Sequence, residues 1–346
     1  MRYNQGMPDD QPAADRIAAT AGGTPPASVP AGDRNAGADF DAAWVAAARV
    51  NRSAVERRVA TLPGRRTVKR EWQAAWLVRA IQCIDLTTLA GDDTPGNVAR
   101  LCAKARRPVR DDLVAALGLA PGDVHVAAVC VYHALVPTAV AALRGTGIPV
   151  AAVSTGFPAG QTPFDLKLRE IEASVRAGAR EIDVVISRRH ALLGDWRALY
   201  DEVRAFRAAC GDAHLKVILA TGELGTLTTV ARASRACLLA GADFIKTSTG
   251  KERVNATPAV GLVMARAIRD HADLTGQRAG FKPAGGIGAA RQALDWLVLM
   301  KDELGEAWLE PARFRLGAST LLGDIERQLE HHVTGAYSAA FRHPMG

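Results

Sequence analysis

The sequence predicts an α/β fold, a (β/α)8 TIM barrel, and three observations support that prediction. Short apolar runs alternate with longer amphipathic stretches from residue 81 onward. The runs are apolar throughout, which is typical of parallel strands that helices cover on both faces. Eight such units within roughly 250 residues fit a (β/α)8 barrel. A doubly wound open sheet is the alternative, but the GxGxxG turn that usually marks it is absent after the first run.

Two segments precede the predicted barrel. Residues 1–40 are rich in Ala, Gly, Pro and Asp and poor in bulky apolar residues, so we expect a disordered tail. A mitochondrial transit peptide is the rival interpretation, but such peptides avoid acidic residues. Residues 41–80 have a helical pattern, which predicts a helical lead-in packed on the barrel. The barrel is then expected over 81–333, and a C-terminal tail over 334–346.

The predicted strands follow one another in a regular order, with helical stretches between them. Residues 163–178 and 257–274 are two of these helical stretches, because their apolar residues recur at helical spacing. The expected strands are 83–86, 124–132, 149–156, 181–186, 214–222, 243–249, 279–286 and 313–319. In a barrel the carboxyl ends of the strands meet at one face and carry the chemistry, so polar residues at these ends are the candidates for a site.

Composition excludes several classes of protein. No stretch of eighteen apolar residues predicts a membrane span, and the first ten residues hold no apolar core of a secretory signal. The net charge of +7 is spread over the chain without a dense basic run that alternates with aromatic residues, so we expect no nucleic-acid partner. An anionic small molecule is the better match for a mild positive charge.

The cysteines and histidines predict no metal site. Cys83, Cys102, Cys130, Cys210 and Cys237 are odd in number, scattered and without a CxxC pair. Such usage favours a reducing cytoplasm over a disulfide framework or a zinc site. Because motifs for nicotinamide and pyridoxal phosphate are also missing, we expect no cofactor.

Lysine is scarce, which draws attention to the lysines in strands. Only eight of the 43 basic residues are lysine, and the rest are arginine. A lysine that is kept where arginine usually serves is expected to do something that arginine cannot, such as lose its proton. Lys216, Lys246 and Lys282 fall in the fifth, sixth and seventh predicted strands.

Lys246 and Lys282 are the predicted centre of the site. A lone lysine at a strand end usually extends its ammonium group to solvent, so one lysine would carry little weight. Neighbouring strands lie about 4.8 Å apart, however, so these two ammonium groups are expected to come close together. Burial and mutual repulsion both lower a lysine pKa, and a neutral amine is a nucleophile that forms a Schiff base with a carbonyl group.

Two aspartates, a threonine and a cysteine complete the predicted interior. Asp183 stands in an apolar strand, where it either pairs with a lysine or acts as a general acid/base, and the two roles are compatible. Asp85 has the same ambiguity, with Thr87 as a possible hydroxyl contact for substrate. Lys216 is expected to order the two aspartates. Cys130 is expected to be a small buried hydrophobe, although it lies in the predicted interior and remains a candidate substrate contact.

A phosphate site is predicted from the loops that follow strands 6, 7 and 8. Glycine lets backbone N–H groups approach an anion, and a helix N-terminus favours its charge. The loops after strands 7 and 8 are where barrel enzymes usually hold phosphate. The candidate residues are Gly250, Lys251, Gly285, Gly286, Gly317, Ser319 and Thr320.

Two motifs resemble those of the 2-deoxyribose-5-phosphate aldolase family, class I aldolases on a (β/α)8 barrel. They are FIKTSTGK at 244–251 and GFKPAGGI at 280–287, and further blocks match in order from Ile84 to the last helix. The lead-in and HHVTGAY at 331–337 resemble the longer-chain branch of that family. The resemblance implies reversible cleavage of 2-deoxy-D-ribose 5-phosphate to acetaldehyde and D-glyceraldehyde 3-phosphate in deoxyribonucleoside breakdown.

The resemblance also implies roles for individual residues. Lys246 would form the Schiff base, Lys282 would lower its pKa, and Asp183 would shuttle protons through water. Asp85 and Thr87 would lie near the hydroxyl groups of the substrate. The glycines, Lys251, Ser319 and Thr320 fall on the phosphate-binding positions of the family. A homodimer is implied as well.

Three positions depart from the family pattern or leave it open. Position 288 is Gly288, where many members carry an arginine that helps to hold phosphate. Tyr132 is followed by His133 and not by proline. Tyr337 is the only tyrosine that could act from a mobile tail, as in some members. The alternatives are another Schiff-base barrel aldolase of the transaldolase type, or a non-catalytic barrel that acts as a binding module.

Overall fold

The computed structural model describes residue 17 and residues 34–120 and 122–343. Most of the predicted disordered tail therefore lies outside the described residues. The end of that tail behaves differently from the prediction, because residues 34–40 lie against the barrel. Asn35 is buried, and its side-chain amide donates hydrogen bonds to the carbonyl oxygens of Leu238 and Ala242, at 2.8 and 2.9 Å. Buried polar groups need such partners, and here the barrel supplies them.

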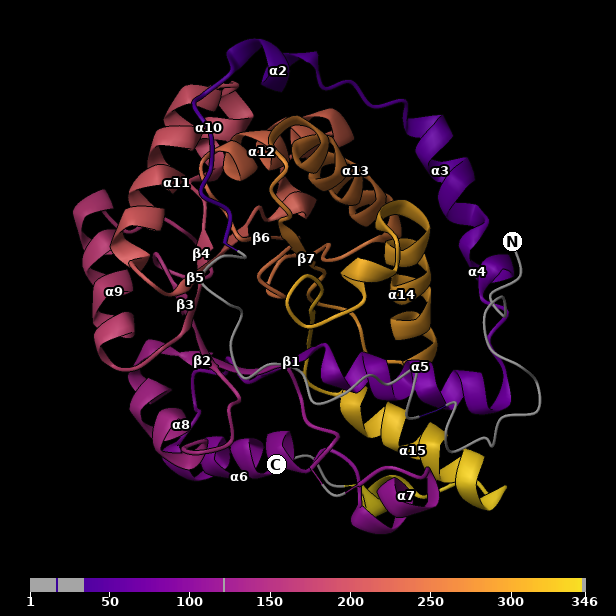
Figure 1. Ribbon diagram of the computed structural model, residues 1–346. Coiled ribbons are helices and arrows are strands. Elements are labelled where there is room, and N and C mark those ends of the chain that lie inside the picture. The colour runs from indigo at the N-terminus through magenta and orange to yellow at the C-terminus, as the bar shows by residue number, and fades with distance from the viewer. Residues whose placement is uncertain (1–16, 18–33, 121, 344–346) are drawn as a thin grey trace.

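Eight parallel strands form the centre of the molecule (Figure 1). Neighbouring strands pair in sequence order from β1 to β7, and β8 pairs with β1. β7 and β8 meet through two parallel bridges, Phe281 to Phe314 and Ala284 to Gly317, which close the barrel. The strands are β1 (Ile84–Thr87), β2 (Ala128–Tyr132), β3 (Val150–Ser154), β4 (Glu181–Val185), β5 (His214–Ile218), β6 (Phe244–Lys246), β7 (Gly280–Lys282) and β8 (Leu316–Ala318). Each of the eight expected strands overlaps one of these, so the barrel prediction is confirmed.

A helix follows every strand and covers the outside of the barrel, as Figure 1 shows. Side-chain caps start several of these helices; the hydroxyl group of Thr257, for example, accepts a hydrogen bond from the amide of Val260. The covering helices are α6 (Pro95–Arg106), α8 (Val136–Ala142), α9 (Phe164–Arg176), α11 (Trp196–Cys210), α12 (Leu227–Leu239), α13 (Pro258–Thr275), α14 (Ala290–Leu304) and α15 (Leu321–Thr334). Two short helices, α7 (Asp111–Ala116) and α10 (Arg188–Leu193), lie in the connections. In the part of the chain that is described, none of the helices is both long and apolar enough to span a membrane.

Among residues 34–120 and 122–343, four helices precede the barrel: α2 (Ala42–Ala47), α3 (Arg52–Ala60), α4 (Leu62–Arg65) and α5 (Arg70–Gln82). α2, α3 and α4 run along the outside of the helical ring, and α5 lies beside α14 and α15 (Figure 1). α2 packs on α12, α3 on α13 and α4 on α14, while α5 packs against both α14 and α15. One continuous cluster of buried apolar side chains joins these helices to the barrel helices. They therefore share the hydrophobic core of the barrel.

Candidate active site

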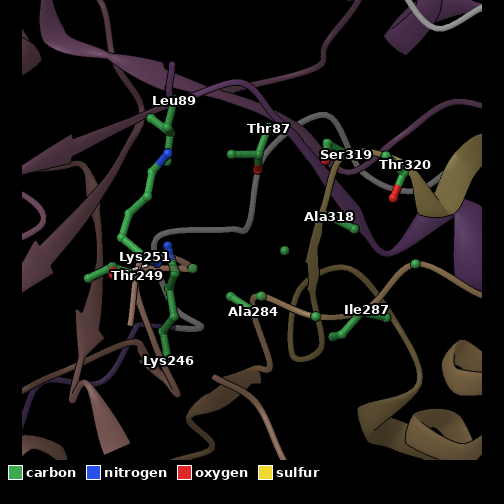
Figure 2. A pocket seen from close by; sticks show the side chains of 15 residues that line it. Thr87, Leu89, Lys246, Thr249, Lys251, Ala284, Ile287, Ala318, Ser319 and Thr320 are labelled. Carbon is green, nitrogen blue, oxygen red and sulfur yellow. Dashed lines mark hydrogen bonds between the residues drawn. The ribbon is translucent and has the colours of Figure 1, made fainter. Parts of the chain in front are cut away.

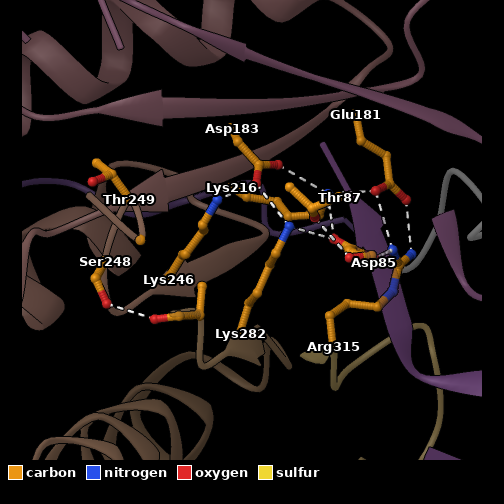
Figure 3. Close-up of polar contacts among 12 residues, drawn as sticks. Asp85, Thr87, Glu181, Asp183, Lys216, Lys246, Ser248, Thr249, Lys282 and Arg315 are labelled. Carbon is orange, nitrogen blue, oxygen red and sulfur yellow. Dashed lines mark hydrogen bonds and ion pairs between the residues drawn. The ribbon is translucent and has the colours of Figure 1, made fainter. Parts of the chain in front are cut away.

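Charged side chains fill the barrel interior, where an apolar core would otherwise be expected. Seven charged residues from six neighbouring segments converge there, and each is at least 97% buried. Residues two positions apart in a strand face the same side, so Glu181 and Asp183 of β4 both point inward. The seven residues, drawn in Figure 3, are Asp85, Glu181, Asp183, Lys216, Lys246, Lys282 and Arg315.

Lys246 and Lys282 share one carboxylate oxygen. The two lysines are register partners on β6 and β7, and their side chains run side by side toward Asp183 (Figure 3). Each ammonium nitrogen lies 2.8 Å from Oδ2 of Asp183. Lys282 also donates a hydrogen bond to Oδ2 of Asp85. The expected lysine pair with a nearby aspartate is therefore present in the structure.

Beneath this pair, Lys216 and Arg315 hold the carboxylates in place. Lys216 lies 3.0 Å from Oδ1 of Asp183 and 3.3 Å from Oδ2 of Asp85, and it pairs with Glu181 as well. Arg315 binds Asp85 at 2.6 Å through Nη1 and Glu181 at 2.7 Å through Nη2. The planar guanidinium group suits such two-sided pairing. Lys216 thus contacts both aspartates.

The balance of charge favours the loss of one proton from the cluster, and the pKa shifts differ between the two lysines. Four cationic side chains face three carboxylates, so the cluster is neutral only when one of the four has lost its proton. Burial, reinforced by Lys282 and opposed by Asp183, lowers the pKa of Lys246. Burial acts in the same direction on Lys282, but Asp183 and Asp85 outweigh it and raise the pKa of Lys282. Lys246 is therefore the amine that the site favours in its neutral form.

The other members of the cluster remain charged. Burial alone would raise the pKa of Asp183, but Lys216, Lys246 and Lys282 hold it well below its usual value. The pKa of Asp85 is likewise lowered, against burial, by Lys216, Lys282 and Arg315. A carboxylate that stays ionised while it touches two lysines is suited to accept and return protons.

A cavity of about 440 Å³ opens above the charged cluster at the carboxyl ends of the strands (Figure 2). Lys246 points into it, and Lys251 extends along the same side toward Leu89, while Ser319 and Thr320 lie on the opposite side. Fifteen residues line it: Thr87, Leu89, Lys246, Thr249, Gly250, Lys251, Ala284, Gly285, Gly286, Ile287, Gly288, Gly317, Ala318, Ser319 and Thr320. The structure thus brings the seven predicted phosphate residues, Lys246 and Thr87 around one cavity.

Several backbone N–H groups that line this cavity have no hydrogen-bond acceptor within the described residues. Within the described residues, the N–H groups of Gly285, Gly286, Ser319 and Thr320 donate to no protein acceptor. They precede the first turns of α14 and α15, where a helix favours negative charge. Gly250 differs from the expectation, because its N–H donates to the carboxylate of Glu252 at 3.1 Å. The N–H of Gly317 is also used, since it donates to the carbonyl oxygen of Pro283 at 2.9 Å.

Cys130 and Tyr337 do not line the cavity. Cys130 is completely buried beside Ala151 and Val153, and burial raises the pKa of its thiol, so it behaves as a small apolar residue. Tyr337 lies beyond the far end of α15, about 21 Å along the helix from the cavity, where its ring packs on His331 at 4.6 Å. The structure does not bring Tyr337 to the site.

Sequence reasoning missed Glu181, Arg315 and Glu252. A signal existed for the first two, because Glu181 lies two residues before Asp183 and Arg315 two residues before Gly317, which places each pair on one face. Glu252 carried no such signal, since a glutamate in a loop is usually solvated. Among the described residues, no group of three or more His, Cys, Asp or Glu side chains could hold a metal ion.

The fold and the site together define a class of protein: a (β/α)8 barrel with a buried lysine that opens onto a cavity lined by Lys251 and by backbone N–H groups. Residues 79–309 match the DeoC/LacD family aldolase. The chain is 58% identical over 313 residues to the deoxyribose-phosphate aldolase of Homo sapiens, covering 90% of this chain and 98% of the human protein. It is also 58% identical to the enzyme of that name from Bos taurus over 89% of this chain and 98% of the relative. This chain belongs to the DeoC/LacD aldolase family.

A solved structure agrees with the fold. The tetrameric deoxyribose phosphate aldolase from Aeropyrum pernix superposes on this chain with a TM-score of 0.56 at 21% sequence identity. The match covers 81% of this chain and 99% of the archaeal chain. At this identity the similarity concerns the barrel alone.

Proposed function

We propose that this protein cleaves 2-deoxy-D-ribose 5-phosphate reversibly to acetaldehyde and D-glyceraldehyde 3-phosphate through a Schiff base on Lys246. One observation carries the proposal: Lys246 faces the cavity, and its pKa is lowered while the pKa values of Lys282 and Lys216 are raised. A lowered pKa increases the share of neutral amine, the form that attacks a carbonyl carbon, and arginine in its place could not do so.

The chemical steps follow from the residues around Lys246. Its amine attacks the C1 aldehyde of the open-chain sugar, and loss of water gives a protonated imine. A base removes the proton from the C3 hydroxyl group, the C2–C3 bond breaks, and its electron pair moves toward the imine to leave an enamine. The C3 carbon departs as the aldehyde of D-glyceraldehyde 3-phosphate. C2 then takes up a proton, and water releases acetaldehyde from the lysine.

Asp183 and Lys282 are positioned to move these protons. Oδ2 of Asp183 lies 2.8 Å from the side-chain nitrogen of Lys246 and 2.8 Å from that of Lys282, so a proton can pass among the three groups and a bound water. Thr87 lines the cavity, and Asp85 lies directly below it, held by Lys282 and Arg315. We assign these two residues to the hydroxyl groups of the substrate, while Cys130 contributes an apolar wall in the interior.

The phosphate group is assigned to the end of the cavity formed by the loops after β6, β7 and β8. Lys251 supplies a cation there, and the N–H groups of Gly285, Gly286, Ser319 and Thr320 supply donors. Gly250 and Gly317 serve mainly by their lack of a side chain; a Cβ at Gly317 would lie 2.7 Å from that of Ala284. Because Gly288 brings no cation, phosphate affinity depends on Lys251 and the backbone.

The wider setting is proposed on the same basis. Five free and buried thiols suit the reducing cytoplasm, where we place the protein in deoxyribonucleoside breakdown. The proposed partners are a sugar phosphate and an aldehyde, with neither a cofactor nor nucleic acid, and the proposed assembly is a homodimer.

The test is turnover by purified protein. The wild-type chain should release acetaldehyde from 2-deoxy-D-ribose 5-phosphate, and Lys246→Arg and Lys246→Met should abolish release while the circular dichroism spectrum stays unchanged. Cleavage of ketose phosphates in preference to this aldose would favour a transaldolase-type enzyme. A folded wild-type protein without activity toward either would favour a non-catalytic barrel.

A further inference from the structure

Arg188 joins four loops at the mouth of the barrel. It is the first residue of α10, directly after β4, and its side chain is 13% exposed. Its guanidinium group donates to the carbonyl oxygens of Ala159 at 2.5 Å and Pro158 at 3.0 Å, in the loop after β3. Nε pairs with Glu223, after β5, at 2.6 Å. Nη2 lies 4.0 Å from Oε1 of Glu252, in the loop after β6.

Glu252 holds the loop that forms one wall of the cavity. Its side chain is 2% exposed, and Oε2 accepts a hydrogen bond from the hydroxyl group of Thr249 at 2.7 Å. The same carboxylate accepts the N–H groups of Thr249 at 3.0 Å and Gly250 at 3.1 Å. The hydroxyl group of Thr249 in turn accepts the N–H of Lys251 at 3.0 Å. One carboxylate thus fixes three successive residues of the cavity wall.

These contacts form a chain that ends at the cation assigned to phosphate. Neither Arg188 nor Glu252 lines the cavity, whereas Thr249, Gly250 and Lys251 do. A carboxylate close to a phosphate site costs affinity through repulsion unless a cation offsets it. Arg188 supplies that cation 4.0 Å from Glu252. Its planar guanidinium group is held in this position by its contacts with the loops after β3 and β5, which the single ammonium group of a lysine could not all make.

We infer that Arg188 and Glu252 are positioning residues that hold Lys251 and the cavity wall in place for the phosphate group of the substrate. This inference rests on the proposed function. It predicts an effect confined to phosphorylated ligands, because Lys246, Lys282 and Asp183 have no contact with either residue. Loss of the pair should therefore leave Schiff-base chemistry intact and weaken the binding of phosphate.

The experiment compares two substrates in matched variants. Arg188→Met removes both the positive charge and the planar guanidinium group, whereas Arg188→Lys keeps only the positive charge. Glu252→Gln replaces the carboxylate by a neutral amide. Arg189→Met is the control, since Arg189 is the next residue of α10, is exposed and makes no hydrogen bond or ion pair among the described residues. Steady-state KM and kcat are measured for 2-deoxy-D-ribose 5-phosphate and for unphosphorylated 2-deoxy-D-ribose.

In both Arg188 variants and in Glu252→Gln, the KM for the phosphorylated sugar should rise about tenfold or more. The reason is that Lys251 and the cavity wall are no longer held in position for the phosphate group. The kcat/KM for the unphosphorylated sugar and all constants of Arg189→Met should stay within about twofold. The Arg188→Met/Glu252→Gln double variant should be little worse than either single variant, because both belong to one chain of contacts.

Three results would overturn the inference: equal losses on both sugars, wild-type behaviour of Arg188→Lys, or effects of the two single variants that multiply in the double variant. Calorimetric titration with inorganic phosphate gives a readout that needs no turnover. If the wild-type protein cleaved neither sugar, the proposed function would fail, and the loss or retention of phosphate affinity in the variants would still decide the inference.

Discussion

Lys282→Met is the substitution that most directly tests why Lys246 is reactive. Methionine has nearly the length of lysine and no charge, so it removes one cation from the cluster with little change in volume. Three cations then face three carboxylates even when Lys246 is protonated. The balance of charge that favours a neutral Lys246 is lost, and the pKa of Lys246 should rise.

The size of the rise follows from the geometry. The two ammonium nitrogens are at most about 5.6 Å apart, twice the 2.8 Å that separates each from Oδ2 of Asp183. At an effective dielectric constant of about 20, two unit charges at that distance repel by about 3 kcal/mol. That energy corresponds to about two pKa units. Since only the neutral amine attacks, the reactive fraction near pH 7 should fall by up to about a hundredfold.

The assay is the rate of borohydride trapping with acetaldehyde as a function of pH, because trapping reports imine formation without the later proton transfers. In Lys282→Met the acid limb of the profile should move to higher pH by about two units. Lys282→Arg keeps the charge and serves as the control, with an acid limb near that of the wild type. An acid limb of Lys282→Met that stays in place, or moves to lower pH, would refute the electrostatic explanation.

Three further predictions concern neighbouring groups. Asp183→Asn should lower turnover by about 10²–10⁴, as for loss of a general acid/base, with trapping at Lys246 retained; turnover within threefold of wild type would remove Asp183 from the mechanism. Arg315→Met leaves Asp85 and Glu181 buried with one partner fewer, so the free energy of unfolding measured in urea should fall by about 3–5 kcal/mol. Arg197→Met, which removes the exposed ion pair with Asp201, is the control and should lower it by less than about 1 kcal/mol. Burial lowers the pKa of His271 from 6.5 to about 4, so the unfolded chain binds a proton at this residue before the folded chain does as pH falls. The free energy of unfolding should therefore drop by about 3 kcal/mol between pH 6.5 and pH 4. In His271→Gln the free energy of unfolding should depend less on pH over this range.

The barrel was predictable because its signal is repeated eight times. Each apolar strand and each amphipathic helix carries its own periodicity, so an error at one boundary leaves the architecture unchanged. The observed strands are shorter than the predicted ones where the chain turns toward the site: β6 ends at Lys246, and the residues after it lead to the cavity wall, which begins at Thr249. The packing of residues 34–40 was not predictable, since Asn35 is anchored by carbonyl groups more than 200 residues away.

The site was predictable as far as it depends on strand ends. Lys246, Lys282 and Asp183 interrupt apolar strands, which is costly without a purpose. Arg315 and Glu252 were missed for different physical reasons. Arg315 was hidden among 35 arginines, and only the alternation along its strand separates it from a surface residue. The role of Glu252 depends on a loop conformation that brings two amides and a hydroxyl group to one carboxylate, which sequence spacing does not encode.

Borohydride trapping followed by peptide mass spectrometry tests the central claim most directly. The protein is incubated with acetaldehyde or 2-deoxy-D-ribose 5-phosphate, reduced and digested, and the modified peptide is identified. The proposed mechanism predicts a reduced adduct on Lys246 and on no other lysine. An adduct on Lys282 would exchange the roles of the two lysines, and a folded protein without any adduct would contradict Schiff-base catalysis at this site.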